Sequence, residues 1–203
     1  EIVSIRSFGA DGDGTDQTIA IQRAIDQLYI NSSTKGTEQS RVSLYFPAGI
    51  YQLTSTIYIP PYATIIGDGM DKTKFNVTSN VTAFQTVNGS STPGNYANDS
   101  SSTTLNQAMH VTMAGFTVTT SSTSLPAMIL QSVKRSHFKE IKFTGPWTTG
   151  TTLTATNAAI KMGSLSNLVC TQRNKFDHVN ISGFTTAIAS DDDVYNNHFH
   201  CSY

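Results

Sequence analysis

Short apolar stretches alternate with turn residues along most of the chain, but one segment near the start follows a helical rhythm. Its apolar side chains recur at i, i+3, i+4 and i+7 and so line one helix face: Ile21, Ala24, Ile25 and Leu28. Either Thr15 or Asp16 is placed to cap the first amides. We therefore expect a short strand at 2–5, a glycine- and aspartate-rich turn at 8–16, and one helix over 18–28.

After residue 41 the pattern changes to short β-type stretches separated by glycine, proline and polar turns. These stretches are rich in β-branched and aromatic residues, which suit a pleated, half-buried surface. They cover residues 42–46, 50–53, 56–59, 64–66, 74–77, 81–87, 109–120, 127–133, 137–144, 158–162, 176–181 and 197–203. Many short strands after a single helix predict an all-β fold, with the helix covering the end of the first strands.

A repeat indicates which all-β fold this is. Apolar residues spaced three and then two apart recur in three places: Val111, Ala114 and Phe116; Phe138, Ile141 and Phe143; Phe176, Val179 and Ile181. The segment at 197–200 echoes that at 174–177, so the steps between units are 27, 38 and 23 residues (111 to 138, 138 to 176, 176 to 199). A fixed unit with variable insertions is typical of a solenoid, and we expect 88–106 and 147–157 to be outer loops.

Composition narrows the function classes. Thirteen Lys and Arg against fourteen Asp and Glu give a net charge of −1, which argues against nucleic acid as the main partner. No apolar run approaches the length that a membrane span needs, so we expect no membrane insertion. Two cysteines, Cys170 and Cys201, are too few for a disulfide scaffold and lack the spacing of a zinc site.

The order of four early segments carries a family resemblance. Residues 8–16 (FGADGDGTD), 18–26, 44–51 (LYFPAGIY) and 64–69 (TIIGDG) resemble the N-terminal cap and first coils of the pectate-lyase-like right-handed β-helix superfamily. The resemblance implies an all-β, right-handed parallel β-helix with an N-terminal capping α-helix. We expect residues 1–40 to form the strand, turn and capping helix, and 41–203 the first coils of a β-helix that continues beyond this sequence.

Candidates for chemistry are few. Asp191, Asp192 and Asp193 form an acidic cluster, and Asp177 lies in a strand with His178; paired carboxylates serve as acid and base on glycosidic bonds. The polygalacturonase branch of the superfamily adds a Gly-His-Gly element and a basic pair, which this sequence lacks, so a solvated turn is the alternative for the triplet. Trp147 is a candidate sugar contact, with a packing plug as its alternative.

The remaining charged and polar residues are open to both binding and structural interpretations. Lys134 with Arg135, and Lys139 with Lys142, could pair with anionic sugars or simply solvate a face. The histidines are expected to form a polar outer ladder along the strands. Asp11, Asp13 and Asp16 resemble a calcium loop, but Gln22 stands where the twelfth-position glutamate is needed, so a structural turn is favoured. We expect no metal and no cofactor.

The resemblance leaves three functions open. The outline is most similar to the β-helical part of a bacteriophage tailspike or tail fibre. That implies a virion tail component that is a homotrimer, contacts other tail proteins and recognises bacterial surface polysaccharide, with or without cleaving it. The second is a secreted polysaccharide lyase or glycoside hydrolase. The third is a purely structural adhesin or capsid decoration, because this fold hosts many functions.

Overall fold

The computed structural model describes residues 1–30, 42–98, 100–166, 168–191 and 193–200. The chain begins with β1 (Ile2–Ser4), a 3-10 turn (Ile5–Phe8), β2 (Asp13–Asp16), α1 (Thr18–Ile25) and a π-helical turn (Asp26–Ile30). The strands that follow are β3 (Ser43–Phe46), β4 (Gly49–Leu53), β5 (Ile57–Ile59), β6 (Thr64–Gly67), β7 (Thr73–Val77), β8 (Phe84–Thr86), β9 (Thr112–Thr120), β10 (Met128–Gln131), β11 (His137–Thr144), β12 (Ala158–Gly163), β13 (Thr171–Gln172), β14 (Lys175–Asp177), β15 (Asn180–Ser182), β16 (Thr186–Ser190), β17 (Val194–Tyr195) and β18 (His198–His200).

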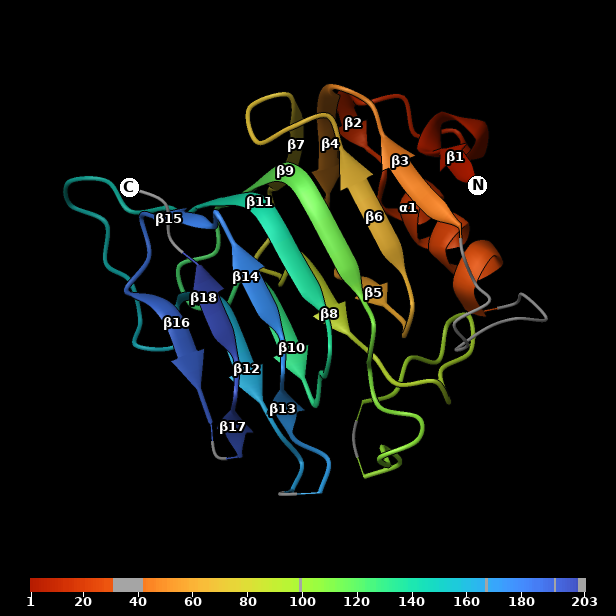
Figure 1. The fold of residues 1–203 in the computed structure, drawn as a ribbon. Coiled ribbons are helices and arrows are strands. Elements are labelled where there is room, and N and C mark those ends of the chain that lie inside the picture. Colours follow the sequence, from red (N-terminus) through yellow and green to blue (C-terminus); the bar gives the residue numbers. More distant parts are fainter. Residues whose placement is uncertain (31–41, 99, 167, 192, 201–203) are drawn as a thin grey trace.

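The strands stack as the coils of a parallel β-helix. The largest sheet has the order β1-β3-β6-β9-β11-β14-β18, a second has the order β16-β12-β10-β8-β5, and β13 pairs with β17. Every pairing between these strands is parallel, as a solenoid of successive turns requires. Figure 1 shows the coils following one another from α1, at the N-terminal end, to β16 and β18. The prediction of a β-helix with an N-terminal capping helix is confirmed.

The register corrects one part of the predicted repeat. Phe138 pairs with Met113 rather than with Val111, and Phe143 pairs with Val118. Met113, Phe116 and Val118 point into the core, so the true unit lies two residues further along than the sequence suggested. Val111 misled because it is fully buried as well; its N–H donates to Ser136 Oγ in the turn before β11. The later units, which begin at Phe138, Phe176 and Phe199, are in register as predicted.

The three-then-two spacing arises from a bend at one residue of each coil. Gly115, Glu140 and His178 occupy this position and all have positive φ, at 74°, 53° and 52°. The bend lets the apolar side chains on both sides of it face the same interior. In the first of these coils glycine is needed sterically as well, because a Cβ on Gly115 would lie 2.7 Å from the carbonyl oxygen of Gly67.

Buried rings and amides hold consecutive coils together. The ring of Phe176 stacks on Phe138 at 5.0 Å and on Phe199 at 4.6 Å between centroids. Beside this stack, the buried Asn174 amide donates to Val133 O at 2.9 Å and to Asn197 Oδ1 at 2.9 Å, and its Oδ1 accepts from Ser136 N at 3.0 Å. This one side chain therefore pairs with the coil before it and the coil after it.

The N-terminal cap differs in detail from the prediction. The α-helix ends at Ile25 and continues as a π-helical turn to Ile30, and the 13–16 segment expected to be only a turn forms β2, which pairs with β4. Asp16 does accept the helix-start amide of Thr18, at 3.1 Å, as one of the two predicted caps. Among the described residues, no helix is long and apolar enough to cross a membrane.

Candidate functional site: the charged outer face of β11, β14 and β18

The outer face of the main sheet carries two ladders of basic and acidic side chains. Alternation puts Phe138, Phe176 and Phe199 on the same side of their strands, so their neighbours point outward. The register aligns His137 with Lys175 and His198, and Lys139 with Asp177 and His200. We call this surface the basic strip, made up of Arg135, His137, Lys139, Lys142, Arg173, Lys175, His198 and His200.

The turn before each strand adds a second row of cations. Arg135 and Arg173 lie at equivalent places two residues before β11 and β14, both with positive φ, at 53° and 57°. Their backbone N–H groups donate to the next coil, from Arg135 to Gln172 O and from Arg173 to Asn196 O. Both side chains are exposed. These bonds fix the backbone in an uncommon conformation and hold two guanidinium groups beside the strip.

Asp177 is the buried anion at the centre of this surface. Its Oδ2 lies 2.7 Å from His137 Nε2 and 2.8 Å from Lys175 Nζ. The Lys175 ammonium holds the pKa of the Asp177 carboxyl below its usual value against the opposing effect of burial, and the hydrogen bond from His137 lowers it further. Asp177 is therefore ionised at neutral pH. That makes it a poor general acid but a firm anchor for the two basic side chains.

Two further carboxylates partly offset the charge of the strip. Lys139 Nζ lies 3.3 Å from Glu140 Oε1, and Lys142 Nζ lies 3.2 Å from Asp71 Oδ1. Both pairs are well exposed, so each contributes little to stability and remains available to a ligand. Five Lys and Arg side chains against three carboxylates leave the surface positive.

The acidic triplet lies elsewhere. Asp191 follows β16, is exposed, and pairs with Lys161 of β12 at 3.3 Å. Asp193 is exposed with φ 58° in the turn before β17, while Asp192 lies outside the described residues. Asp191 follows a strand of the second sheet, whereas Asp177 lies in β14 of the main sheet, so the structure does not bring the two acidic candidates into one ladder.

Trp147 lies past the end of β11, opposite the end where His137 is placed. Its side chain is 60% exposed, and its backbone N–H donates to Gly183 O at 3.2 Å. Gly145 permits the close approach of these two loops, since a Cβ there would lie 2.1 Å from the Gly183 oxygen. An indole this exposed does not act as a packing plug.

The aspartates of the early turn serve structure. Asp13 Oδ1 accepts from Thr15 N, Thr15 Oγ1 and Gln17 Nε2, and Asp16 accepts from Thr18 and from Thr54 Oγ1. These hydrogen bonds lower the pKa of Asp13. Across the described parts of the chain, no group of three or more His, Cys, Asp or Glu side chains is arranged to hold a metal ion.

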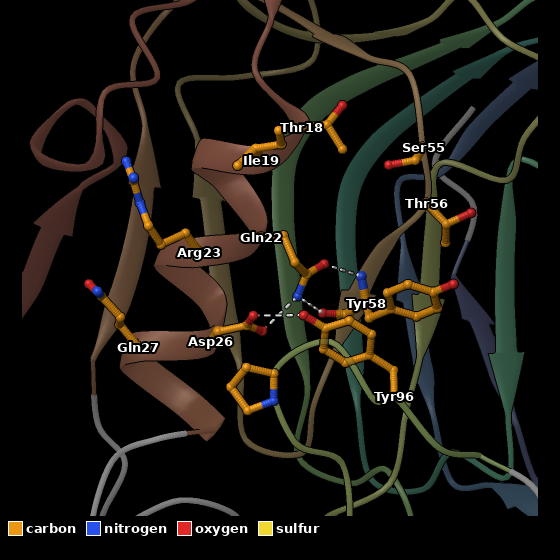
Figure 2. Close-up of a pocket in the computed structure, with 11 residues that line it drawn as sticks. Thr18, Ile19, Gln22, Arg23, Asp26, Gln27, Ser55, Thr56, Tyr58 and Tyr96 are labelled. Carbon is orange, nitrogen blue, oxygen red and sulfur yellow. Dashed lines mark hydrogen bonds between the residues drawn. The ribbon is translucent and has the colours of Figure 1, made fainter.

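Sequence reasoning missed a cleft beside the capping helix. It lies between α1 and β5, and the loop that follows β8 closes it with Tyr96 (Figure 2). Tyr96 belongs to the Ser-, Thr- and Asn-rich segment predicted to be a plain outer loop, yet its hydroxyl donates to Asp26 Oδ2 at 2.6 Å. The only hint in the sequence was a lone tyrosine in a polar segment. A contact between residues 70 positions apart produces no periodic pattern along the chain, so its partner could not be predicted.

The fold and its outer face define a right-handed parallel β-helix protein. The family described as rhamnogalacturonase A/epimerase, pectate lyase-like, matches residues 2–200, and the chain belongs to that family. A glucan 1,3-beta-glucosidase of Cochliobolus carbonum is 40% identical over 67 residues, which cover 32% of this chain and 7% of that protein. The chain thus matches only a small part of the length of this relative.

Three solved structures share the fold. Geobacillus virus E2 ORF18 superposes with a TM-score of 0.55 at 18% identity, over 98% of this chain and 41% of that one. PfbA, a surface adhesin of Streptococcus pneumoniae, gives 0.54 at 15% identity, over 89% and 38%. A putative glycosyl hydrolase from Parabacteroides merdae gives 0.51 at 15% identity, over 98% and 94%.

Proposed function

We propose that this chain is the glycan-recognition β-helix of a bacteriophage tail appendage, and that its basic strip binds an acidic polysaccharide of the bacterial surface. The observation that carries the proposal is the pair of aligned ladders, His137–Lys175–His198 and Lys139–Asp177–His200. Adjacent strands in a sheet lie about 4.8 Å apart. Lys139 and Lys175 in these ladders, with Arg135 and Arg173 in the turns beside them, present cations at the repeat of the coils to an extended polyanion.

The state of Asp177 favours binding over hydrolysis. Hydrolysis of a glycosidic bond needs one carboxyl that can donate a proton. Asp177 is ionised and held by Lys175 and His137, so its chemistry suits the positioning of cations. Among the solved proteins of this fold are a viral protein and a surface adhesin, which is compatible with a role in attachment.

The second candidate is a secreted polysaccharide lyase or glycoside hydrolase. The family description and the stretch similar to a glucan 1,3-beta-glucosidase favour it. Its acids would be Asp177 and the exposed Asp191 and Asp193. Release of reducing ends or unsaturated products from a panel of polysaccharides, abolished in Asp177→Asn, would replace the binding proposal with this one.

The binding proposal is tested by charge removal. Immobilised bacterial capsular polysaccharides, one rich in uronic acid and one neutral, are titrated with the chain and with the double variant Lys139→Gln/Arg173→Gln. We expect the acidic polymer to bind, the double variant to lose roughly tenfold in affinity at low salt, and the loss to shrink as salt rises.

A matched control lies on the second sheet of the β-helix. Lys161 pairs with Asp191 at 3.3 Å, the same separation as Lys139 and Glu140, and is exposed to a similar extent. Lys161→Gln removes one exposed charge without touching the basic strip and should leave the affinity unchanged. Equal losses in Lys161→Gln and Lys139→Gln would show a diffuse charge effect and contradict a defined binding surface.

The tail-appendage part of the proposal predicts the oligomer. Appendages of this class are expected to be parallel homotrimers that join other virion tail proteins. Light scattering on the complete native protein should give three times the chain mass. A stable monomer would favour the secreted enzyme instead.

A further inference from the structure

The cleft beside the capping helix has a different chemistry from the basic strip. It has a volume of about 460 Å³ and lies between α1 and β5, with the loop after β8 as its third wall (Figure 2). Its walls combine two tyrosines, a proline, side-chain amides and hydroxyls. The lining residues are Thr18, Ile19, Gln22, Arg23, Asp26, Gln27, Ser55, Thr56, Tyr58, Pro93 and Tyr96.

Two parallel tyrosine rings form the aromatic part of the wall. Tyr58 and Tyr96 stack with their centroids 4.4 Å apart and their planes at 15°. Both side chains are only partly buried. They lie 38 positions apart in the sequence (58 to 96) and come from a strand and a loop. A stacked pair held this way is a rigid apolar surface that costs little entropy when a flat ligand contacts it.

Asp26 at the floor of the cleft fixes this arrangement. It is nine-tenths buried; its Oδ2 accepts from Tyr96 Oη at 2.6 Å and its Oδ1 from Gln22 Nε2 at 2.9 Å. Burial, and to a smaller extent the hydrogen bond to Asp26, raises the pKa of Tyr96 to about 12, so its phenol stays neutral. The cleft is therefore preorganised around an uncharged hydroxyl and a satisfied carboxylate.

The edge of β5 in this cleft is already occupied. β5 is the last strand of its sheet, and such an edge invites another strand to pair with it. Here Gln22 Oε1 accepts from Tyr58 N at 2.8 Å, and Gln22 Nε2 donates to Tyr58 O at 3.3 Å. An extended peptide consequently cannot add to β5 at Tyr58, and ligand recognition is left to the side chains.

We infer that this cleft is a second saccharide-binding site, which takes a neutral hexose unit of a glycan. The Tyr58–Tyr96 pair offers a flat face for the C–H surface of a pyranose ring. The rim offers hydroxyls and amides from Ser55, Thr56 and Gln27 for the ring hydroxyls. The lining holds one acidic side chain, Asp26, and one guanidinium, Arg23, so its formal charges balance, which suits a neutral sugar better than an acidic one. The inference does not depend on the basic strip, which would bind the acidic parts of a polysaccharide.

The test uses the full chain with tyrosine rings labelled for NMR. Neutral hexasaccharides of β-1,3- and β-1,4-linked glucose are titrated, with a hexagalacturonate as the acidic counterpart. We expect the ring signals of Tyr58 and Tyr96 to shift with a neutral hexasaccharide and to shift less with the acidic one. Because this measurement uses the unmodified chain, no folding defect can obscure it.

Variants then locate the binding. Tyr58→Leu and Tyr96→Leu should each weaken binding of the neutral sugar at least about fivefold, because stacking on one aromatic ring contributes on the order of 1 kcal/mol. Tyr62→Leu is the matched control: Tyr62 is also partly buried and stacks on a ring, that of His110 at 5.1 Å, outside the cleft. It should change the affinity less than twofold.

Two results would overturn the inference. One is the absence of any shift at Tyr58 and Tyr96 with neutral hexasaccharides up to about 10 mM, the weak end of specific binding. The other is an equal loss of affinity in Tyr62→Leu. Loss of acidic-polymer binding in the strip variant, with neutral binding intact, would leave this inference standing alone.

Discussion

The side-chain amide of Gln22 pairs with the main chain of Tyr58 as a neighbouring strand would, through Oε1 at 2.8 Å and Nε2 at 3.3 Å. The capping helix thereby closes the open edge of β5, which a β-helix would otherwise expose at its first coil. One residue of α1 carries this contact, while Ile21, Ala24 and Ile25 bury the apolar face of the helix.

Gln22→Leu tests this cap. The substitution keeps a similar volume but removes the hydrogen bonds that Gln22 makes with the Tyr58 N–H and with Asp26 Oδ1, while Asp26 Oδ2 still accepts from Tyr96. We expect a loss of about 1–3 kcal/mol in the free energy of unfolding, measured by denaturant titration. Gln27→Leu, at an exposed position of the π-helical turn that follows α1, should change the free energy of unfolding by less than about 0.5 kcal/mol. Equal effects would contradict the capping role.

Tyr29→Phe tests the anchor between the cap and the first coil. Tyr29 Oη lies 2.8 Å from the carbonyl oxygens of Val42 and Thr64 and accepts from Leu44 N at 3.2 Å. Removing this hydroxyl leaves buried backbone groups without a hydrogen-bond partner, so we expect the free energy of unfolding to fall by about 2 kcal/mol at neutral pH. Burial raises the pKa of Tyr29 from 10.0 to about 12.

The same residue predicts a pH dependence. Because the folded pKa is the higher one, the Tyr29 contribution is complete below about pH 10. It is lost as the pH rises from there through about 12. Unfolding titrations from pH 9 upward should show a shallower alkaline decline in Tyr29→Phe, within the interval that these two pKa values define. Parallel declines in the two proteins would exclude Tyr29 as the cause.

Asn174→Ala tests the amide ladder between coils. Asn174 is fully buried and makes hydrogen bonds to Ser136, Val133 and Asn197. Loss of this amide leaves several buried polar groups without a hydrogen-bond partner, and we expect the free energy of unfolding to fall by about 3 kcal/mol. Asn180→Ala, at an exposed position of β15, is the control and should be close to neutral. Thermal unfolding followed by circular dichroism distinguishes the two.

Asp177→Asn tests the centre of the basic strip by its acid dependence. The folded pKa of Asp177 is lowered, so its contribution to stability is present above about pH 4. It is lost as the pH falls from there through the lower folded value. The variant should therefore be less stable than the parent at pH 7, with the difference shrinking below pH 4. A constant difference across the acid range would show that Lys175 and His137 do not hold an ionised carboxylate.

The fold was largely predictable because its signal repeats. Three successive coils place an aromatic residue at the same point, so Phe138, Phe176 and Phe199 mark the stack without any knowledge of the structure. The register at β9 was mispredicted because burial alone does not distinguish the turn residue Val111 from the strand residue Met113. Backbone pairing decides between them, and a sequence does not display it.

The sites were less accessible to sequence reasoning. Asp177 was a candidate from its strand position, and Lys175 lies two residues before it in β14, but the contact with His137 depends on the spacing between coils, which insertions vary. The Asp26–Tyr96 contact joins the end of the capping helix to an inserted loop, and each such pair occurs once. Contacts that do not recur leave no pattern along the chain.

Hydrogen exchange of the chain with and without an acidic capsular polysaccharide tests directly whether β11, β14 and β18 recognise the glycan. We expect protection in the peptides that cover 135–144 and 173–182, which carry most of the basic strip. We expect no change in 84–86 and 158–163, which belong to the other sheet. Protection confined to the second sheet, or no protection while the polymer binds, would contradict the assignment of glycan recognition to β11, β14 and β18.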